Sequence, residues 1–156
     1  MELTQLAQLG EFIGGIAVLV TLIYLAVQVG GSKKALKTQT HHNLLSIAQR
    51  PYELLVADDE LASIVERGNK DPVGLSPPQW IRYCAYTMML INAWEYGFYL
   101  SRAGSTPPEL WEGADAHFAA QAASHAGWRT YWEENSHTFA EPFHSYAENH
   151  FPGRAV

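Results

Sequence analysis

The chain has 156 residues, with sixteen acidic against ten basic side chains, a formal net charge of −6 and one cysteine. A net acidic chain without a basic stripe argues against nucleic acid as a partner. Because Cys84 is alone in an apolar stretch, the sequence holds no disulfide framework and no CxxC metal or redox site, and we expect a small buried side chain. The length excludes more than one modest domain after the first apolar segment.

The first predicted element is an apolar helix that contains residues 12–29, FIGGIAVLVTLIYLAVQV. The run carries no formal charge, and with its flanks it is long enough to cross a hydrocarbon core of about 30 Å at about 1.5 Å per residue. The residues before it are acidic and lack Lys and Arg, whereas a secretory signal begins with a basic segment. We therefore predict a transmembrane anchor over residues 1–31. A signal cleaved near residues 30–32 and a buried core helix stay as alternatives.

Basic residues follow this span at once and none precedes it, since Lys33, Lys34 and Lys37 come directly after it. Loops rich in Lys and Arg stay on the cytoplasmic side of a membrane. This predicts a single-pass protein of the inner (cytoplasmic) membrane with a cytoplasmic C-terminal domain. The three lysines are also candidates for contact with anionic lipid headgroups, although they are fewer than a usual polybasic cluster.

Small residues lie on one face of the span, where Gly10 and Gly14 are four residues apart and Gly15 is adjacent. Such a small-xxx-small pair lets another membrane helix approach closely. We expect a helix–helix contact here. The alternative is that these glycines only reflect the general frequency of glycine in membrane helices.

Residues 32–156 are predicted to form one small all-α bundle, because period-2 alternation and Asn-Gly hairpin turns are absent. Gly30-Gly31 is expected to loosen the join to the span, after which Ser32 caps a helix over about 33–49. Pro51 should break or kink that helix, or open a second one.

A short helix is predicted to follow Asp58, to run through Glu66 and to be closed by Gly68. Residues 71–74, Asp-Pro-Val-Gly, read as a loop.

Two capping signatures then open the next helices. Ser76-Pro77-Pro78-Gln79 begins a helix expected to reach Arg102 and to stop at Gly104. Thr106-Pro107-Pro108-Glu109 repeats the signature and begins a helix through about residue 123. Further on, residues 128–134 are expected to be helical, Thr138 to Glu141 fits one more capping box, and the tail beyond Pro152 should fray.

The helix that opens at Pro77 is the predicted centre of the bundle, because residues 83–100 contain only Asn92 and Glu95 as strongly polar side chains. Both would be costly in lipid, which argues against a second transmembrane span. Bulky aromatic residues are expected to supply the core: Trp80, Trp94, Phe98, Trp111, Phe118, Trp128, Trp132, Phe139 and Phe143.

Glu95 is the strongest single candidate for a special role, because a carboxylate in an apolar helix is costly unless it is paired. We predict a buried ion pair with Arg129 or Arg102. A catalytic or ligand-binding acid and simple exposure stay open as alternatives.

The C-terminal part holds two Glu-x-x-His motifs, Glu134 to His137 and Glu141 to His144, with Glu148 further along. This spacing occurs in di-iron bundles, where the two motifs lie on facing helices. Here they are consecutive, so we expect an exposed polar face and neither a metal nor a cofactor. Zinc-protease, phosphate-loop, dinucleotide and nucleophile-elbow motifs are absent. No catalytic residue is therefore assigned, and we expect a protein that is not an enzyme.

The chain resembles a family of small, uncharacterised bacterial proteins with one N-terminal transmembrane helix and a helical domain. The resemblance implies this architecture and carries no activity. One departure is the segment 30–33, Gly-Gly-Ser-Lys, where that family tends to continue the helix with polar and basic residues. The matching features are GEFIGGIAVLVTLIYLAVQV, Asp59-Glu60-Leu61-Ala62, Arg67-Gly68, Asp71-Pro72, Leu75-Ser76-Pro77, Trp94-Glu95, Tyr99, Gly104, Gly127 through Arg129 to Trp132-Glu133, Phe139 and Phe143.

These features favour a non-catalytic, single-pass accessory subunit of a larger membrane complex, for example a bioenergetic assembly. Its partners would be integral membrane protein subunits and membrane lipid, with no nucleic acid. The alternatives are a membrane-tethered enzyme or metal- or ligand-binding domain that uses Glu95 or the C-terminal Glu/His stripe, and a sensor that reads the membrane through the anchor.

Overall fold

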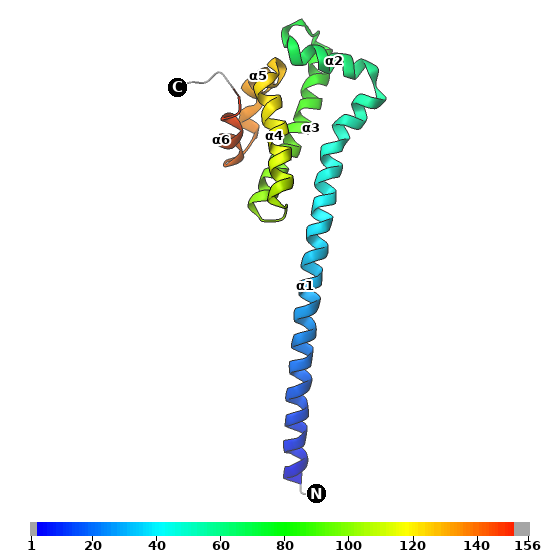
Figure 1. The fold of residues 1–156 in the computed structure, drawn as a ribbon, viewed down its shortest axis with the longest axis vertical. Coiled ribbons are helices and arrows are strands. Elements are labelled where there is room, and N and C mark those ends of the chain that lie inside the picture. Colours follow the sequence, from blue (N-terminus) through cyan, green and yellow to red (C-terminus); the bar gives the residue numbers. More distant parts are fainter. Residues whose placement is uncertain (1–2, 152–156) are drawn as a thin grey trace. The chain divides into compact units, whose positions relative to one another are not determined.

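The computed structural model describes residues 3–151, without the side chains of 3–7, 9, 33, 34, 37 and 41. In that part of the chain every regular element is a helix and no strand occurs, which confirms the all-α prediction (Figure 1). The chain divides into two compact units, Met1–Gln39 and Thr40–Val156. The elements are α1 (Leu3–Ala57), α2 (Asp59–Lys70), the 3₁₀ turn η1 (Pro72–Gly74), α3 (Pro77–Arg102), α4 (Pro108–Ser124), α5 (Ala126–Asn135), the 3₁₀ turn η2 (Ser136–Thr138) and α6 (Phe143–Glu148).

Helix α1 is continuous where the sequence predicted a join and a break. It passes through Gly30-Gly31, since glycine costs only about 1 kcal/mol per residue in a helix and does not forbid it. It also contains Pro51, whose side chain is fully buried in the bundle. That burial offsets the backbone hydrogen bond that proline cannot donate. The predicted start at Ser32 and end near Gln49 are therefore wrong.

Helix α2 starts as predicted, with the Leu61 N–H donating to the Asp58 carboxylate at 2.9 Å. It runs on to Lys70, so Gly68 is not its stop. Instead, Gly68 lies against the ring of Tyr83, and a Cβ on Gly127 of α5 would overlap the Gly68 carbonyl and the Tyr83 hydroxyl. The two glycines let α2, α3 and α5 approach closely. The predicted loop after α2 contains the short turn η1.

Helix α3 has the bounds that its sequence signals predicted. The Ser76 N–H donates to the Gln79 side chain at 3.1 Å, and Gly104 follows the helix with φ of +64°. α3 contacts α2, α4, α5 and α6, and Trp94 in its middle is fully buried. It is thus the centre of the bundle, as expected.

The later capping predictions are only partly right. Helix α4 starts at Pro108, but the Thr106 hydroxyl is buried without a hydrogen-bond partner and does not cap it. Thr138 ends the turn η2 and donates to the Asn135 carbonyl at 2.8 Å. The next helix, α6, starts only at Phe143, and the Glu141 carboxylate accepts from the Ser145 N–H at 3.3 Å. The tail beyond Pro152 lies outside the described residues.

Aromatic rings fill the core as predicted. Trp94 meets Phe143 edge-on with ring centroids 5.6 Å apart, and Trp132 stacks on Phe139 at 5.3 Å. Seven of the nine predicted aromatic residues are buried, and the other two, Trp80 and Trp111, are half-buried and pack against the core. Tyr83 and Tyr131 are core residues that the sequence analysis missed.

Candidate interaction surfaces

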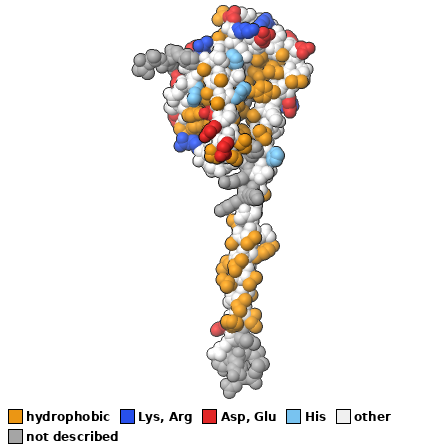
Figure 2. Space-filling model, in the orientation of Figure 1, with side chains coloured by type: hydrophobic (Ala, Val, Ile, Leu, Met, Phe, Trp, Pro, Cys, Tyr) orange, Lys and Arg blue, Asp and Glu red, His pale blue; other side chains and the backbone are white. Residues whose placement is uncertain are grey.

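The N-terminal part of α1 is apolar and exposed on every side. Residues Gly10–Ser32, a stretch of 23, are long and apolar enough to cross a membrane, and none of that length is buried. Hydrophobic side chains cover this segment in Figure 2. The alternative of a buried core helix therefore does not describe it.

Two polar side chains in this segment, Thr21 and Gln28, form hydrogen bonds within the helix itself. The Thr21 hydroxyl donates to the Ala17 carbonyl at 2.8 Å, and the Gln28 amide donates to the Tyr24 hydroxyl. Internal satisfaction is what a hydrocarbon environment demands of polar groups. The segment is thus long and apolar enough to span a membrane, and these two polar side chains need no partner outside it.

The glycine face of α1 is open. A Cβ placed on Gly10, Gly14 or Gly15 would meet no atom within 4 Å. Each glycine is exposed. The geometry therefore leaves room for the backbone of another helix to approach.

The three lysines predicted to face lipid headgroups, Lys33, Lys34 and Lys37, lie on the helical backbone of α1. Their side chains lie outside the described residues.

Glu95 is half-buried on α3, and burial raises the pKa of its carboxyl group. Among the described residues no ion pair joins it to Arg129 or to Arg102. The Arg102 guanidinium lies over the Phe98 ring, 5.5 Å from its centroid. Partial exposure leaves Glu95 partly hydrated, so the carboxylate does not need a partner within the fold.

Polar links between helices come from residues that the sequence analysis did not single out. The Trp94 indole donates to the Asp115 carboxylate at 2.7 Å, and the Trp132 indole donates to Glu148 at 2.6 Å. Burial, followed by the neighbouring Asp115 carboxylate, raises the pKa of Tyr146. A buried Trp needs an acceptor for its N–H, and this rule was the signal available in the sequence.

A second link ties α3 to α2. The Arg82 guanidinium contacts Asp58 and Glu60, each at 2.7 Å. All three side chains are at least one-third exposed, so the pairs orient the helices more than they stabilise them.

The two Glu-x-x-His motifs do not come together as a metal site. His144 lies 3.5 Å from Glu141 and stacks on Trp132, while Glu148 accepts from that Trp132 indole. Neither motif lies on a single helix, because Glu134 is on α5 and His137 on η2, while Glu141 precedes α6 and His144 lies on it. Within residues 3–151 no three His, Cys, Asp or Glu side chains are placed to hold a metal ion.

Cys84 is half-buried on α3, less than the sequence predicted. Burial raises the pKa of its thiol to about 11. At neutral pH the group is a protonated thiol.

The bundle carries grooves on its surface. One groove of about 540 Å³ lies between α2 and the start of α5, and its polar lining includes Lys70, His125 and Arg129. Lys70 already pairs with Glu66 at 2.7 Å. Burial, together with the nearby His117, lowers the pKa of His125 and so favours the neutral form of its ring. A second groove, of about 370 Å³, lies between the last part of α1 and α3 and is lined by Ser46, Ile47, Arg50, Met89 and Asn92.

Comparisons with protein-family models, with curated proteins and with solved structures find no match for this chain. The resemblance to a bacterial family therefore stays a prediction. What the structure defines is a class: an all-helical protein with one N-terminal helix that is long and apolar enough to span a membrane.

Proposed function

We propose that this chain is a non-catalytic, single-pass accessory subunit of a larger membrane complex, for example a bioenergetic assembly. Its N-terminal helix docks against helices of integral membrane subunits, and residues 40–156 brace the assembly from the cytoplasmic side. One observation carries this proposal: the segment Gly10–Ser32 is long, apolar and unburied, and its one charged side chain, Glu11, lies at its first turn.

The glycine face gives the anchor a way to dock. Side-chain packing drives helix association in lipid, because lipid tails are as apolar as the helix. The open space at Gly10, Gly14 and Gly15 lets a partner backbone approach closely. A larger side chain at this face would keep the helix in the membrane and prevent the close contact.

Orientation in the inner membrane follows from Lys33, Lys34 and Lys37, which lie directly after the span. Their charge holds that end of the helix on the cytoplasmic side. The same lysines then sit at the level of anionic headgroups.

The docking experiment is a pull-down of the full chain from solubilised membranes at native expression, with mass spectrometry of the recovered proteins. We expect membrane subunits at fixed stoichiometry with the wild type, and their loss with Gly14→Ile. The matched control is Ile23→Phe, which enlarges a side chain on the opposite face of the same helix and should keep the partners. Recovery of the chain alone, or equal recovery with both variants, would contradict the proposal.

The topology is tested with a single accessible thiol. Val73 is 91% exposed on η1, so Val73→Cys in a Cys84→Ala background presents a reactive group in the helical domain. A membrane-impermeant maleimide should label it only after the inner membrane is opened. Labelling in intact spheroplasts would place the domain on the other side.

A further inference from the structure

A third groove, of about 320 Å³, lies on the bundle between the turn η1, the start of α3 and α5. Most of its wall is apolar, and its acidic side chain lies on α5. We call it the Trp80 groove, and its lining includes Pro72 and Leu75 at η1, Pro77 and Trp80 on α3, and Thr130 and Glu134 on α5.

The Trp80 groove carries a negative charge that the fold leaves uncompensated. Glu134 is its only charged lining residue, is exposed, and forms no ion pair with any described residue. It lies in the last turn of α5, a turn without a basic side chain. The carbonyl groups at the end of a helix favour a cation there and disfavour an anion. The side chain and the helix end therefore both attract positive charge to this groove.

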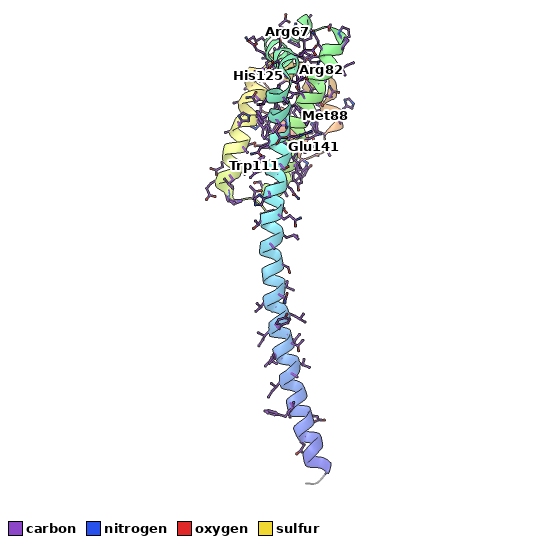
Figure 3. All side chains as sticks on the ribbon, turned by 90° about the vertical axis from the view of Figure 1, so that its right-hand side faces the viewer. Arg67, Arg82, Met88, Trp111, His125 and Glu141 are labelled. Atoms are coloured by element: carbon purple, nitrogen blue, oxygen red, sulfur yellow. The ribbon has the colours of Figure 1, made fainter. Side chains whose placement is uncertain are left out.

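The basic residues that are closest to this groove in the sequence have other partners or places. Lys70 pairs with Glu66 at 2.7 Å, and Arg82, labelled in Figure 3, pairs with two carboxylates at the start of α2. Arg129 lines the separate groove between α2 and α5. None of the three lines the Trp80 groove. The described part of the chain thus supplies no cation to the Glu134 carboxylate.

Trp80 gives the groove an aromatic wall that is held in place. Its ring stacks on the buried ring of Tyr83, with centroids 5.3 Å apart and planes inclined by 12°. The half-buried indole still lines the groove. The electrons of an aromatic ring attract a cation placed within about 6 Å of its centre, and tryptophan attracts it most strongly. Trp80 and Glu134 thus favour the same kind of ligand.

The groove offers such a ligand few hydrogen-bond partners. The Thr130 hydroxyl donates to the Ala126 carbonyl of its own helix at 3.3 Å, so the Glu134 carboxylate is the main acceptor among the lining side chains. A primary ammonium or a guanidinium group brings several N–H donors, and each donor that leaves water without finding an acceptor costs free energy. A quaternary ammonium group has no N–H donor, and its methyl groups match an apolar wall.

We propose that the Trp80 groove is a binding site for a quaternary ammonium group. The methyl groups of the ligand pack against Trp80 and the neighbouring prolines, and the Glu134 carboxylate lies beside the positive charge. The field of that carboxylate already reaches α3, where burial first and Glu134 second raise the pKa of the Cys84 thiol. This site belongs to the helical domain and does not depend on the proposed docking of the anchor.

The test observes Trp80 in the full chain, labelled with fluorotryptophan and held in a non-ionic detergent. The chain has five tryptophans, and Trp80→Phe and Trp111→Phe identify the fluorine NMR signals of these two. Choline chloride is titrated in exchange for sodium chloride, so that the ionic strength stays constant. We expect the Trp80 signal to shift and to saturate. The signal of Trp111, a half-buried ring on α4 that does not line the groove, should stay in place.

Two related compounds separate the charge of the ligand from its shape. In the neutral carbon analogue of choline, a tert-butyl group replaces the trimethylammonium group. It should bind at least about tenfold more weakly, because it lacks the attraction to the aromatic ring and to the carboxylate. Ethanolamine has a primary ammonium group and should also bind more weakly than choline, because the groove leaves some of its N–H donors without an acceptor.

Glu134→Gln tests the carboxylate and leaves the apolar wall intact. It should weaken choline binding by about fivefold, as expected for an exposed ionic contact. Glu133→Gln is the matched control, because it removes an exposed carboxylate of the same helix that does not line the groove, and it should leave the affinity unchanged. Gly14→Ile in the anchor should leave the affinity unchanged as well, so this site and the proposed docking are tested separately.

The source of the ligand is distinguished in lipid nanodiscs that contain no free choline. Phosphatidylcholine nanodiscs present the quaternary ammonium group on a lipid, whereas phosphatidylglycerol nanodiscs do not. If only the phosphatidylcholine nanodiscs shift the Trp80 signal to its choline-bound position, the ligand is a lipid head group. If the signal keeps its ligand-free position in both, the choline that binds in the titration represents a soluble ligand.

Three results would overturn the proposal. One is a titration without a saturable shift of the Trp80 signal, or with an equal shift of the Trp111 signal. Another is equal affinity for choline and for its neutral analogue, which would leave only an apolar groove. The third is an equal loss of affinity in Glu133→Gln and Glu134→Gln, which would mean that the net negative charge of the domain, and not this groove, attracts the cation.

Discussion

The apolar segment of α1 and the central helix α3 look alike in composition and behave differently in structure. Both are apolar nearly all round, but residues 10–32 of α1 are wholly exposed, whereas α3 buries Tyr83, Ile91 and Trp94 completely. The difference lies in the polar groups. In α1 the hydroxyl of Thr21 is satisfied by its own helix, while the indole of Trp94 in α3 donates to Asp115 on α4. An apolar helix that needs acceptors on other helices belongs to a core, and one that needs none suits lipid.

The largest expected effect separates the two helices by stability. Trp94→Ala removes a fully buried ring, and we expect it to lower the free energy of unfolding of the domain by about 3 to 5 kcal/mol. Leu19→Ala in the exposed anchor should leave that free energy unchanged. All five tryptophans lie between residues 80 and 132, so fluorescence during urea unfolding of the full chain in detergent reports on the domain. An equal decrease in the free energy of unfolding in both variants would contradict the distinction between a packed core helix and an exposed anchor.

Glycine-to-alanine substitutions compare the same two parts of the molecule, the packed bundle and the exposed anchor. Gly127→Ala places a Cβ against the Gly68 carbonyl and the Tyr83 hydroxyl, and the forced shift of backbone should cost about 2 to 3 kcal/mol. Gly14→Ala meets open space and should leave domain unfolding unchanged. Urea midpoints of the two variants check this. A tolerated Gly127→Ala would show that α2 and α5 can separate without loss.

The next largest expected effect on the free energy of unfolding comes from the hydrogen bond between Trp94 on α3 and Asp115 on α4. Asp115→Ala leaves the buried Trp94 indole without its acceptor, which should cost about 2 kcal/mol. Glu112→Ala on the same helix removes an exposed carboxylate and serves as the control. A blue shift and altered near-ultraviolet circular dichroism of Trp94 should accompany only the first variant. If both variants unfold at the wild-type midpoint, water replaces the lost acceptor.

Local sequence signals predicted the bounds of α3 correctly. Features that depend on long-range packing, such as the place of Pro51 and the surroundings of Glu95, could not be predicted from the sequence. Ser76, Gln79 and Gly104 act within one helical turn, so their effect is readable from the chain. The sequence predicted a break, a kink or a new helix start at Pro51, but this buried proline lies inside the continuous helix α1. Likewise, the sequence located Glu95 in an apolar helix, but the predicted ion pair with Arg129 or Arg102 does not occur among the described residues. Such a pair depends on where separate parts of the fold place their side chains.

The smallest effect concerns that carboxylate. Burial raises the pKa of the Glu95 carboxyl group in the folded state, so the folded protein binds this proton more tightly than the unfolded chain does. The carboxyl group therefore contributes favourably to the free energy of unfolding below its pKa in the unfolded chain. This contribution is lost as the pH rises through its pKa in the folded protein. Glu95→Gln should stabilise the domain at pH 7 by less than about 1 kcal/mol, since the side chain is partly solvated, and should have no effect at pH 3. Urea midpoints at the two pH values measure the difference. A variant that is less stable than wild type at pH 7 would show that the Glu95 carboxylate makes a favourable charge interaction in the folded protein.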